Sequence, residues 1–231
     1  FSRPYVFASD GEPYGPPPGL SAEISEEELA ELRRKRPKDL EDEEIVHLIQ
    51  NGDEHHFDLL VGRYQDRIYN TSMRILGDSD EALDATQEVF IKAYRGIPRF
   101  AFKSTFYTWL YQIALNYCRS LLRSRSRAAR IRMLPLDVSA EADEMHELSI
   151  PDEAPPPLEK LEMKELHDAA EEALLKLRPE FREVIVLRDV DGMNYDQIAI
   201  VLDCSMGTVK SRLHRARNAL ASLLTRYLES I

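Results

Sequence analysis

Apolar residues recur at helical spacing in two parts of this chain, and neither part shows the alternation of a half-buried strand. The first part predicts helices over residues 42–50, 54–75, 79–95 and 105–123, and the second over residues 158–176, 179–189, 195–202 and 206–228. This periodicity indicates an all-α protein built from two small helical domains.

The segment between these parts has the composition of a linker. Residues 133–165 hold ten acidic residues against Lys160 and Lys164, and prolines 151, 155, 156 and 157 interrupt any helix. We therefore divide the 231 residues into four parts: an amino-terminal extension (1–40), a first domain (41–127), a linker (128–157) and a second domain (158–231). The extension is rich in proline at its start and in charged residues after that, which favours a poorly ordered tail that becomes helical near 26–36. The alternative is an arm that docks on a specific partner.

Composition excludes several classes of protein. No stretch approaches the ~20 apolar residues of a membrane helix, and the first thirty residues lack a secretory apolar region, so we expect an intracellular protein without membrane insertion. Cys118 and Cys204 lack partners at metal-ligand spacing, which favours structural roles over zinc or a disulfide. We expect no cofactor and no enzyme, because neither paired carboxylates in a metal-binding context nor a phosphate-binding glycine loop is found.

Positive charge is concentrated in a chain whose formal net charge is −11. Residues 99–132 contain no acid and eight cations, which are Arg99, Lys103, Arg119, Arg123, Arg125, Arg127, Arg130 and Arg132. The same stretch carries the aromatic residues Phe100, Phe102, Phe106, Tyr107, Trp109 and Tyr111. Cations neutralise phosphates and flat rings stack on unpaired bases, so this stretch is predicted to bind single-stranded nucleic acid.

The helix predicted over 105–123 has two distinct faces. Its polar face holds Thr108, Gln112, Asn116, Arg119 and Arg123, with Trp109 at the margin. The preceding loop, residues 99–105 with Phe102, Lys103 and Ser104, is predicted to hold an unstacked base. In the alternative interpretation the aromatic residues are core, which must hold for Phe106 and is less convincing for Phe102 and Trp109.

A second acid-free basic segment, residues 204–228, has the pattern of a DNA-binding helix. Val209, Leu213, Ala216 and Leu220 share one side, and Lys210, Ser211, His214 and Arg215 lie opposite. Ser205 is a candidate helix cap, and Asn194 with Gln197 form a capping-box pair at the start of the helix before it. Two helices joined by residues 203–205 predict a helix-turn-helix whose second helix enters a major groove, rather than a merely solvated surface helix.

The helix predicted over 81–94 has a candidate partner-binding face. We expect an inward stripe of Ala82, Leu83, Thr86, Val89, Phe90, Ala93 and Tyr94. The outward face carries Asp84, Gln87, Glu88, Ile91 and Lys92. An exposed Ile91 among acids indicates either a protein contact or an isolated surface residue, and the pattern alone does not separate the two.

Three motifs in this order carry a family resemblance. The runs over 84–94 (DATQEVFIKAY), 106–111 (FYTWLY) and 203–212 (DCSMGTVKSR) resemble the extracytoplasmic-function group of bacterial RNA polymerase sigma factors, over about residues 42–125 and 158–228. The resemblance implies that Asp84, Gln87, Glu88, Ile91 and Lys92 contact the clamp helices of the polymerase largest subunit. It also implies that residues 99–123 recognise and melt the minus-ten element. It further implies that the minus-thirty-five element is contacted by Ser205, Thr208, Lys210, Ser211, Arg212, His214 and Arg215.

The resemblance also implies binding partners, and the chain departs from the family pattern in one loop. We expect core RNA polymerase, promoter DNA as duplex and as melted non-template strand, and an anti-sigma factor as partners, in a bacterial cytoplasm. Family loops commonly read Phe-x-Gly-acid before the Phe-x-Thr-Trp motif, whereas Phe102 replaces the glycine here and Lys103 the acid. The alternative function is a one-component helix-turn-helix regulator of duplex DNA. We further hypothesise that the acidic segment 133–165 either repels DNA or covers the basic helices when polymerase is absent.

Overall fold

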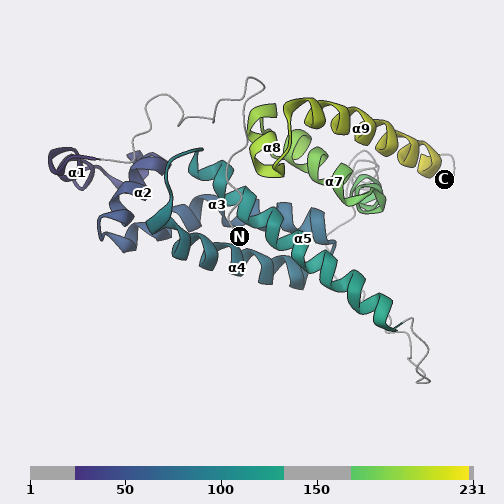
Figure 1. Cartoon of the computed structure of the whole chain (residues 1–231), viewed down its shortest axis with the longest axis horizontal. Helices are drawn as coiled ribbons and strands as arrows, with labels where there is room; N and C mark the ends of the chain where they lie inside the picture. The colour runs from purple at the N-terminus through teal and green to yellow at the C-terminus, as the bar shows by residue number, and fades with distance from the viewer. Residues whose placement is uncertain (1–23, 133–167, 229–231) are drawn as a thin grey trace, which may run out of the picture.

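The computed structural model describes residues 24–132 and 168–228, and all regular structure within these ranges is helical (Figure 1). The first range contains α1 (Glu26–Leu32), α2 (Asp42–Gln50), α3 (Phe57–Leu76), α4 (Ser79–Gly96) and α5 (Phe106–Arg132). The second contains a helical segment over 168–176, then α7 (Pro179–Ile185), α8 (Tyr195–Leu202) and α9 (Met206–Leu228). Short 3₁₀ turns cover Pro37–Asp39, Glu54–His56 and Ile97–Arg99. The prediction of an all-α fold is confirmed.

In the first domain α3, α4 and α5 pack on one another, and α3 and α5 also pack on α2. The interior consists of large aliphatic and aromatic side chains, among them Leu48, Leu60, Ile68, Ile75, Leu110 and Leu115. The α3–α4 corner is locally determined, because Gly77 ends α3 in the left-handed region (φ +73°) and Asp78 Oδ1 accepts the Glu81 N–H at 2.8 Å. The two long helices are thereby set side by side.

Helix α5 is longer than predicted, since it ends at Arg132 instead of residue 123. Its end projects beyond the neighbouring helices (Figure 1), and all side chains from 123 to 128 are exposed. Arg125 anchors the projecting part, because it pairs with Glu81 of α4 and donates to the Leu76 carbonyl at 3.2 Å. Arginine and alanine are good helix formers, so the helix continues without a covering partner.

The described part of the amino-terminal extension folds against α2. Ser25 and Glu28 form a capping box at the start of α1, and Leu29 and Leu32 are buried. An ion pair joins Lys35 to Glu44 of α2 at 2.5 Å. The helix predicted near 26–36 forms, but it ends at Leu32, four residues before the predicted limit. The part of the extension before residue 24 lies outside the described residues.

The second domain contains the predicted helix-turn-helix. Asn194 Oδ1 accepts the Gln197 N–H at 2.8 Å and Gln197 Oε1 accepts the Asn194 N–H at 3.0 Å, which is the predicted capping box of α8. Ser205 Oγ accepts the Thr208 N–H at 3.1 Å and so caps α9. The helix predicted over 179–189 differs, because α7 ends at Ile185 and a π-helical turn, Val186–Val190, follows it.

The two domains pack against each other, with α8 beside α5 and α7 beside α3 (Figure 1). Residues 133–167 lie outside the described residues, and they include most of the predicted linker, the acidic segment 133–165 and the predicted helical residues 158–167. The first residues of the predicted linker, 128–132, continue α5. Across 24–132 and 168–228, no helix has both the length and the apolar character needed to cross a membrane.

Candidate nucleic-acid interface

Helix α9 separates an apolar face from a basic face. Val209, Leu213 and Ala216 are buried in the core of the second domain, and the opposite face exposes Lys210, Ser211, His214 and Arg215. Ser205 is also exposed, and Thr208 and Arg212 are half-buried. The structure therefore places most of the predicted minus-thirty-five residues on one open surface, at the helix end that a helix-turn-helix inserts into a groove.

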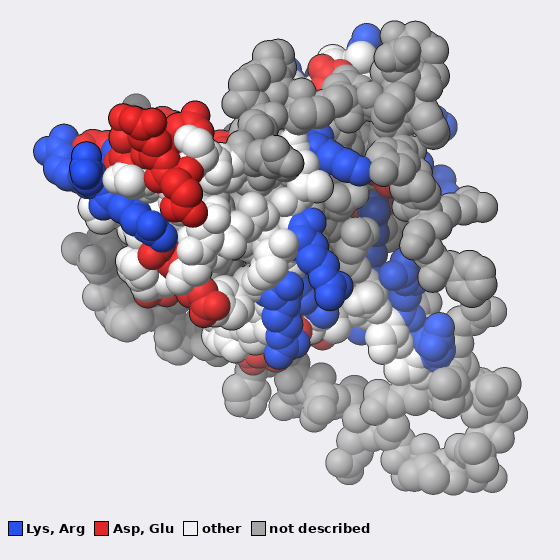
Figure 2. Space-filling model, turned by 60° about the vertical axis from the view of Figure 1, so that its left-hand side comes forward, with Lys and Arg blue, Asp and Glu red and all other residues white. Residues whose placement is uncertain are grey.

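The predicted minus-ten residues are distributed less evenly. Lys103, Asn116 and Arg123 are exposed, and Ser104, Trp109, Gln112 and Arg119 are half-buried. Phe102 and Thr108 are in the core. On the face that Figure 2 draws, Lys and Arg side chains lie in separate groups, and most of the acidic side chains lie toward its left-hand end.

The prediction of a Phe102 ring available to bases is wrong for this structure. The side chain is 0% exposed and stacks on the His47 ring, with centroids 4.3 Å apart and planes at 17°. Its backbone lies in the left-handed region (φ +51°), which turns the ring inward against α2. Phe100 is also buried and meets Phe102 edge to face. These rings hold the loop to the domain.

Thr108 is likewise removed from the predicted polar face. It is 1% exposed, and its hydroxyl lies 2.9 Å from that of Thr105. Thr105 Oγ1 also accepts the Thr108 N–H at 3.2 Å. Thr108 therefore belongs to the hydrogen-bonded first turn of α5, which helical projection alone does not distinguish from an outward position.

Trp109 lies at the boundary between core and surface. Its ring contacts those of Phe100 and Phe106, with centroids 5.0 Å and 5.8 Å away. It also lies over Gly96, where an added Cβ would come within 2.9 Å of the indole. The absence of a side chain at Gly96 thus leaves room for the half-buried indole beside the loop.

Gln112 and Arg119 contact the second domain. Gln112 Nε2 donates to the Ile200 carbonyl of α8 at 3.4 Å. Arg119 donates from Nε and Nη2 to the two carboxylate oxygens of Glu183, at 2.8 and 2.7 Å. This hydrogen bond is the main cause that raises the pKa of Arg119. Two side chains predicted to bind DNA therefore have protein partners here.

Sequence reasoning missed Asp191, which follows the π-helical turn. Tyr111 donates to its Oδ1 at 2.9 Å, and Thr71 donates to its Oδ2 at 3.0 Å. Burial raises the pKa of Asp191, and the hydrogen bonds from Tyr111 and Thr71 act in the opposite direction. No local pattern marks this residue, because its partners lie far away in the sequence.

The outward face of α4 is open. Asp84, Gln87, Ile91 and Lys92 are exposed and Glu88 is half-buried. Leu83 and Tyr94, which were expected to face inward, are 51% and 41% exposed. Ala85 takes an inward position instead, so the buried stripe is rotated from the predicted one, and Tyr94 donates to Glu54 at 2.6 Å. Ile91 is thus accompanied by two further exposed apolar or aromatic side chains.

No group of three or more His, Cys, Asp or Glu side chains within the described residues is arranged to hold a metal ion. Cys118 is buried and Cys204 half-buried, and both are free thiols.

Two family models match this chain. The model of Sigma-70 region 2 matches residues 60–128, and the model of Sigma-70, region 4 matches residues 167–220. Together they cover more than half of the chain and the larger part of both basic helices, α5 and α9. The matches define a two-domain protein of the sigma-70 class.

Curated relatives and solved structures agree. The chain is 39% identical to the RNA polymerase sigma-H factor of Pseudomonas aeruginosa over 188 residues, which cover 80% of this chain and 94% of that protein. It is 37% identical to the ECF RNA polymerase sigma-E factor of Escherichia coli K12 over 182 residues, or 78% and 93% of the two chains. The chain belongs to the extracytoplasmic-function (ECF) group of sigma-70 factors. It acts in promoter recognition and transcription initiation by RNA polymerase, and it is not an enzyme.

Two solved structures share the fold. The structure of CnrH in complex with the cytosolic domain of CnrY matches with a TM-score of 0.57 and 26% identity, over 80% of this chain and 97% of that one. The complex of the sigma factor RpoE with the anti-sigma factor NepR from Bartonella quintana matches with a TM-score of 0.55 and 25% identity, over 73% and 96%.

Proposed function

We propose that the exposed basic face of α9 recognises the minus-thirty-five promoter element. The observation that carries the proposal is the separation of faces on this helix, because Val209, Leu213 and Ala216 anchor it while Lys210 and Arg215 are exposed. Exposed cations and short polar side chains on a helix of groove-entering geometry contact phosphates and base edges. Ser205, Thr208, Ser211, Arg212 and His214 complete this proposed contact set.

For the minus-ten element we propose α5 and the loop before it. The contacts are assigned to exposed and half-buried side chains, which are Lys103, Ser104, Trp109, Gln112, Asn116, Arg119 and Arg123. Phe102 and Thr108 are assigned to holding the loop and the first turn in place. Binding energy from phosphate contacts and stacking offsets the few kcal/mol that each unstacked base costs, so an opened strand is trapped rather than chemically changed.

The outward face of α4 is the proposed contact with core RNA polymerase. It presents Asp84, Gln87, Glu88, Ile91 and Lys92, to which the exposed Leu83 adds apolar area. A partly apolar, acid-rimmed helix face of this kind suits a protein partner. We keep the domain limits 41–127 and 158–231 for these two functional units, although α5 continues beyond the first.

We also propose an anti-sigma factor as a partner and the cytoplasm as the place of action. Two structures of similar fold were solved in complexes, one with an anti-sigma factor and one with the cytosolic domain of CnrY. Polymerase and chromosomal DNA are cytoplasmic in bacteria, so a subunit that joins them acts there.

Run-off transcription tests the proposal. Core polymerase, the purified chain and a library of promoter fragments should give transcripts from a subset that shares two elements, and core polymerase alone should give none. Transcripts that do not depend on the chain would contradict the proposed function. Binding of the free chain to palindromic duplex sites would instead indicate a one-component regulator.

A further inference from the structure

The exposed basic face of α9 begins with an apolar residue. Met206 is the first residue of this helix, and it is 42% exposed. Among the side chains of α9 that the structure describes, it is the one large apolar side chain that is exposed. Val209 and Leu213 already anchor the first turns of the helix in the core. Met206 therefore lies outside that core and presents its thioether to the solvent.

Met206 shares its side of the helix with residues of the proposed minus-thirty-five contact. Lys210 and His214 follow it at intervals of four residues, which places the three side chains on successive turns of one face. All three are exposed. Ser211 and Arg215, which are also exposed, lie in the adjacent row. The apolar side chain thus stands at the end of a surface that is otherwise polar and basic.

The first turn of α9 holds Met206 in a defined and uncrowded position. Ser205 Oγ accepts the Thr208 N–H at 3.1 Å and lies 2.9 Å from the Thr208 hydroxyl. Asp203 ends α8 in the left-handed region (φ +51°), which makes the turn between the two helices tight. A Cβ added at Gly207 would meet only Ser205 Oγ, at 3.8 Å. This end of the helix is therefore fixed by its caps and open beside Met206.

The place of Met206 in the fold identifies the chemistry that it can contact. In a helix-turn-helix the first residues of the second helix contact base edges in the major groove. Those edges carry hydrogen-bond donors and acceptors, and their one methyl group is the C5-methyl of thymine. A thioether donates no hydrogen bond and accepts one only weakly, whereas it packs well on irregular apolar surfaces. The thymine methyl is thus the group in the major groove that best complements Met206.

We propose that Met206 determines specificity within the minus-thirty-five element by packing on the C5-methyl group of a thymine. This inference rests on the proposed function, because it adds a base contact to the same face of α9. Phosphate contacts by a cation such as Lys210 position the helix without reading the sequence. A contact between Met206 and the methyl group, in contrast, distinguishes thymine from cytosine. The element should accordingly contain, on one strand or the other, a thymine whose methyl group contributes to binding.

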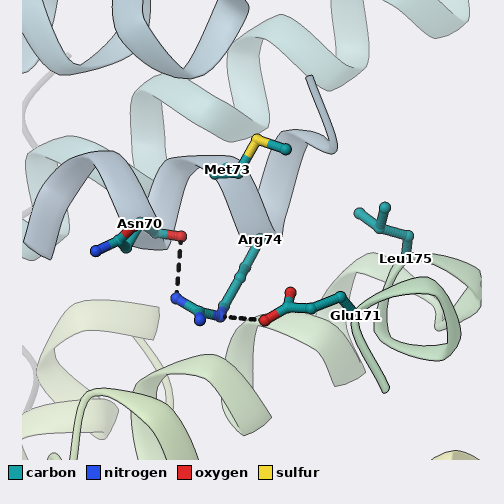
Figure 3. A pocket seen from close by; sticks show the side chains of 5 residues that line it. All are labelled: Asn70, Met73, Arg74, Glu171 and Leu175. Carbon is teal, nitrogen blue, oxygen red and sulfur yellow. Dashed lines mark hydrogen bonds and ion pairs between the residues drawn. The ribbon is translucent and has the colours of Figure 1, made fainter. Parts of the chain in front are cut away.

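Met73 of α3 provides a matched control. It is the other exposed methionine among the described residues, at 36%. Met73 lines a pocket together with Leu175, beside the ion pair of Arg74 and Glu171 (Figure 3). Met73→Ala therefore removes the same type of side chain from a surface that lies outside the proposed DNA contacts.

Deoxyuridine tests the contact, because it differs from thymidine only by the absence of the C5-methyl group. A promoter is first selected by run-off transcription with core polymerase and the wild-type chain. Each thymine of its upstream element, on either strand, is then replaced singly by deoxyuridine, and duplex binding by the holoenzyme is measured by gel-shift titration. With the wild-type chain, one replacement should weaken binding about fourfold, which is the effect of one buried methyl group.

Variants of Met206 separate a methyl contact from a general loss of binding. Met206→Ala and Met206→Gln should bind the thymine and deoxyuridine promoters equally well, because alanine is too short to reach the methyl group and glutamine replaces the thioether with a polar amide. Met206→Leu keeps an apolar side chain and should retain most of the fourfold difference. Met73→Ala should retain all of it, and Lys210→Ala should weaken binding of both promoters by the same factor.

The inference is overturned if no deoxyuridine replacement weakens binding by the wild-type holoenzyme, or if every such effect persists unchanged in Met206→Ala. An upstream element without thymine on either strand overturns it as well. Run-off transcription separates these results from failure of the proposed function. Transcripts that depend on the chain, without any effect of the methyl group, leave the promoter role standing and remove only the contact by Met206. If no transcript depends on the chain, the promoter role fails and the inference fails with it.

Discussion

The ring of Phe102 stacks on the imidazole of His47 with centroids 4.3 Å apart, while the Phe102 backbone occupies the left-handed region at φ +51°. Related loops commonly have glycine at this position, and the positive φ explains why, since glycine adopts it without steric cost. In this chain the burial of a large ring against α2 compensates for the strained backbone.

Substitution of Phe102 should therefore show an unusual order of stability. Phe102→Ala loses the buried ring and retains the strain, which should cost about 3–5 kcal/mol of unfolding free energy. Phe102→Gly loses the same ring but relieves the backbone, and should be about 1 kcal/mol more stable than the alanine variant. Urea unfolding followed by the fluorescence of Trp109, the single tryptophan, measures both. An alanine variant as stable as the glycine variant would show that the positive φ is not strained.

The two cysteines should differ in reactivity. Burial raises the pKa of the Cys118 thiol to about 11, so about one molecule in a thousand carries the thiolate at pH 8. Cys204 is only half-buried at the turn before α9. Iodoacetamide at pH 8 should label Cys204 first and Cys118 only after unfolding, as peptide mass spectrometry would detect. Equal labelling of both thiols in the native protein would show that α5 opens locally.

Much of the architecture is encoded locally and could be predicted. The Asn194–Gln197 pair and Ser205 make the cap hydrogen bonds expected from their spacing. The apolar periodicity of α9 predicts which face of the helix is buried, because a single apolar stripe dominates that helix. Elements whose ends and faces are set by neighbouring residues are thus accessible from one sequence.

Features set by distant residues could not be predicted. The hydrogen bond from Tyr111 to Asp191 spans 80 residues, and that from Thr71 spans 120. The inward turn of Phe102 depends on a ring in α2, and a helical projection cannot show that Thr108 bonds to Thr105. Tertiary contacts therefore decide which residues of the proposed minus-ten surface on α5 are exposed, and a helical projection does not show these contacts.

Variants of Arg215 and Trp109 should separate two steps of initiation. Arg215→Ala removes a cation from the exposed face of α9 and should weaken binding of the upstream element by about 1–3 kcal/mol. Arg226→Ala, an exposed arginine near the other end of α9, is the matched control and should have little effect. Gel-shift titration of holoenzyme on duplex promoter measures the difference. Equal losses from both arginine variants would indicate a general charge effect rather than recognition.

Trp109→Ala should leave that first step intact and impair strand opening. The half-buried indole lies beside the loop proposed to hold a base, and a stacked base is worth about 1–3 kcal/mol. Permanganate footprinting of unpaired thymines should therefore decrease while duplex binding by holoenzyme is retained. A parallel loss of both signals would contradict the proposed division of labour between α5 and α9.

Acidification should strengthen the contact between the two domains. Burial raises the pKa of Asp191 in the docked state above its value in the separated state, so docking takes up a proton. Docking of the two domains should accordingly be weakest above the raised pKa of Asp191 and become stronger as the pH falls through it toward the unperturbed value of about 3.9.

The groups that face this carboxylate are Arg67 and Arg74 of α3 and Tyr107 and Tyr111 of α5, which keep their protonation over that range. Scattering at pH 7.5 and pH 5 should show a more compact wild type at pH 5, and Asp191→Asn, which cannot ionise, should be compact at both. An Asp191→Asn chain that still contracts on acidification would assign the response to another group.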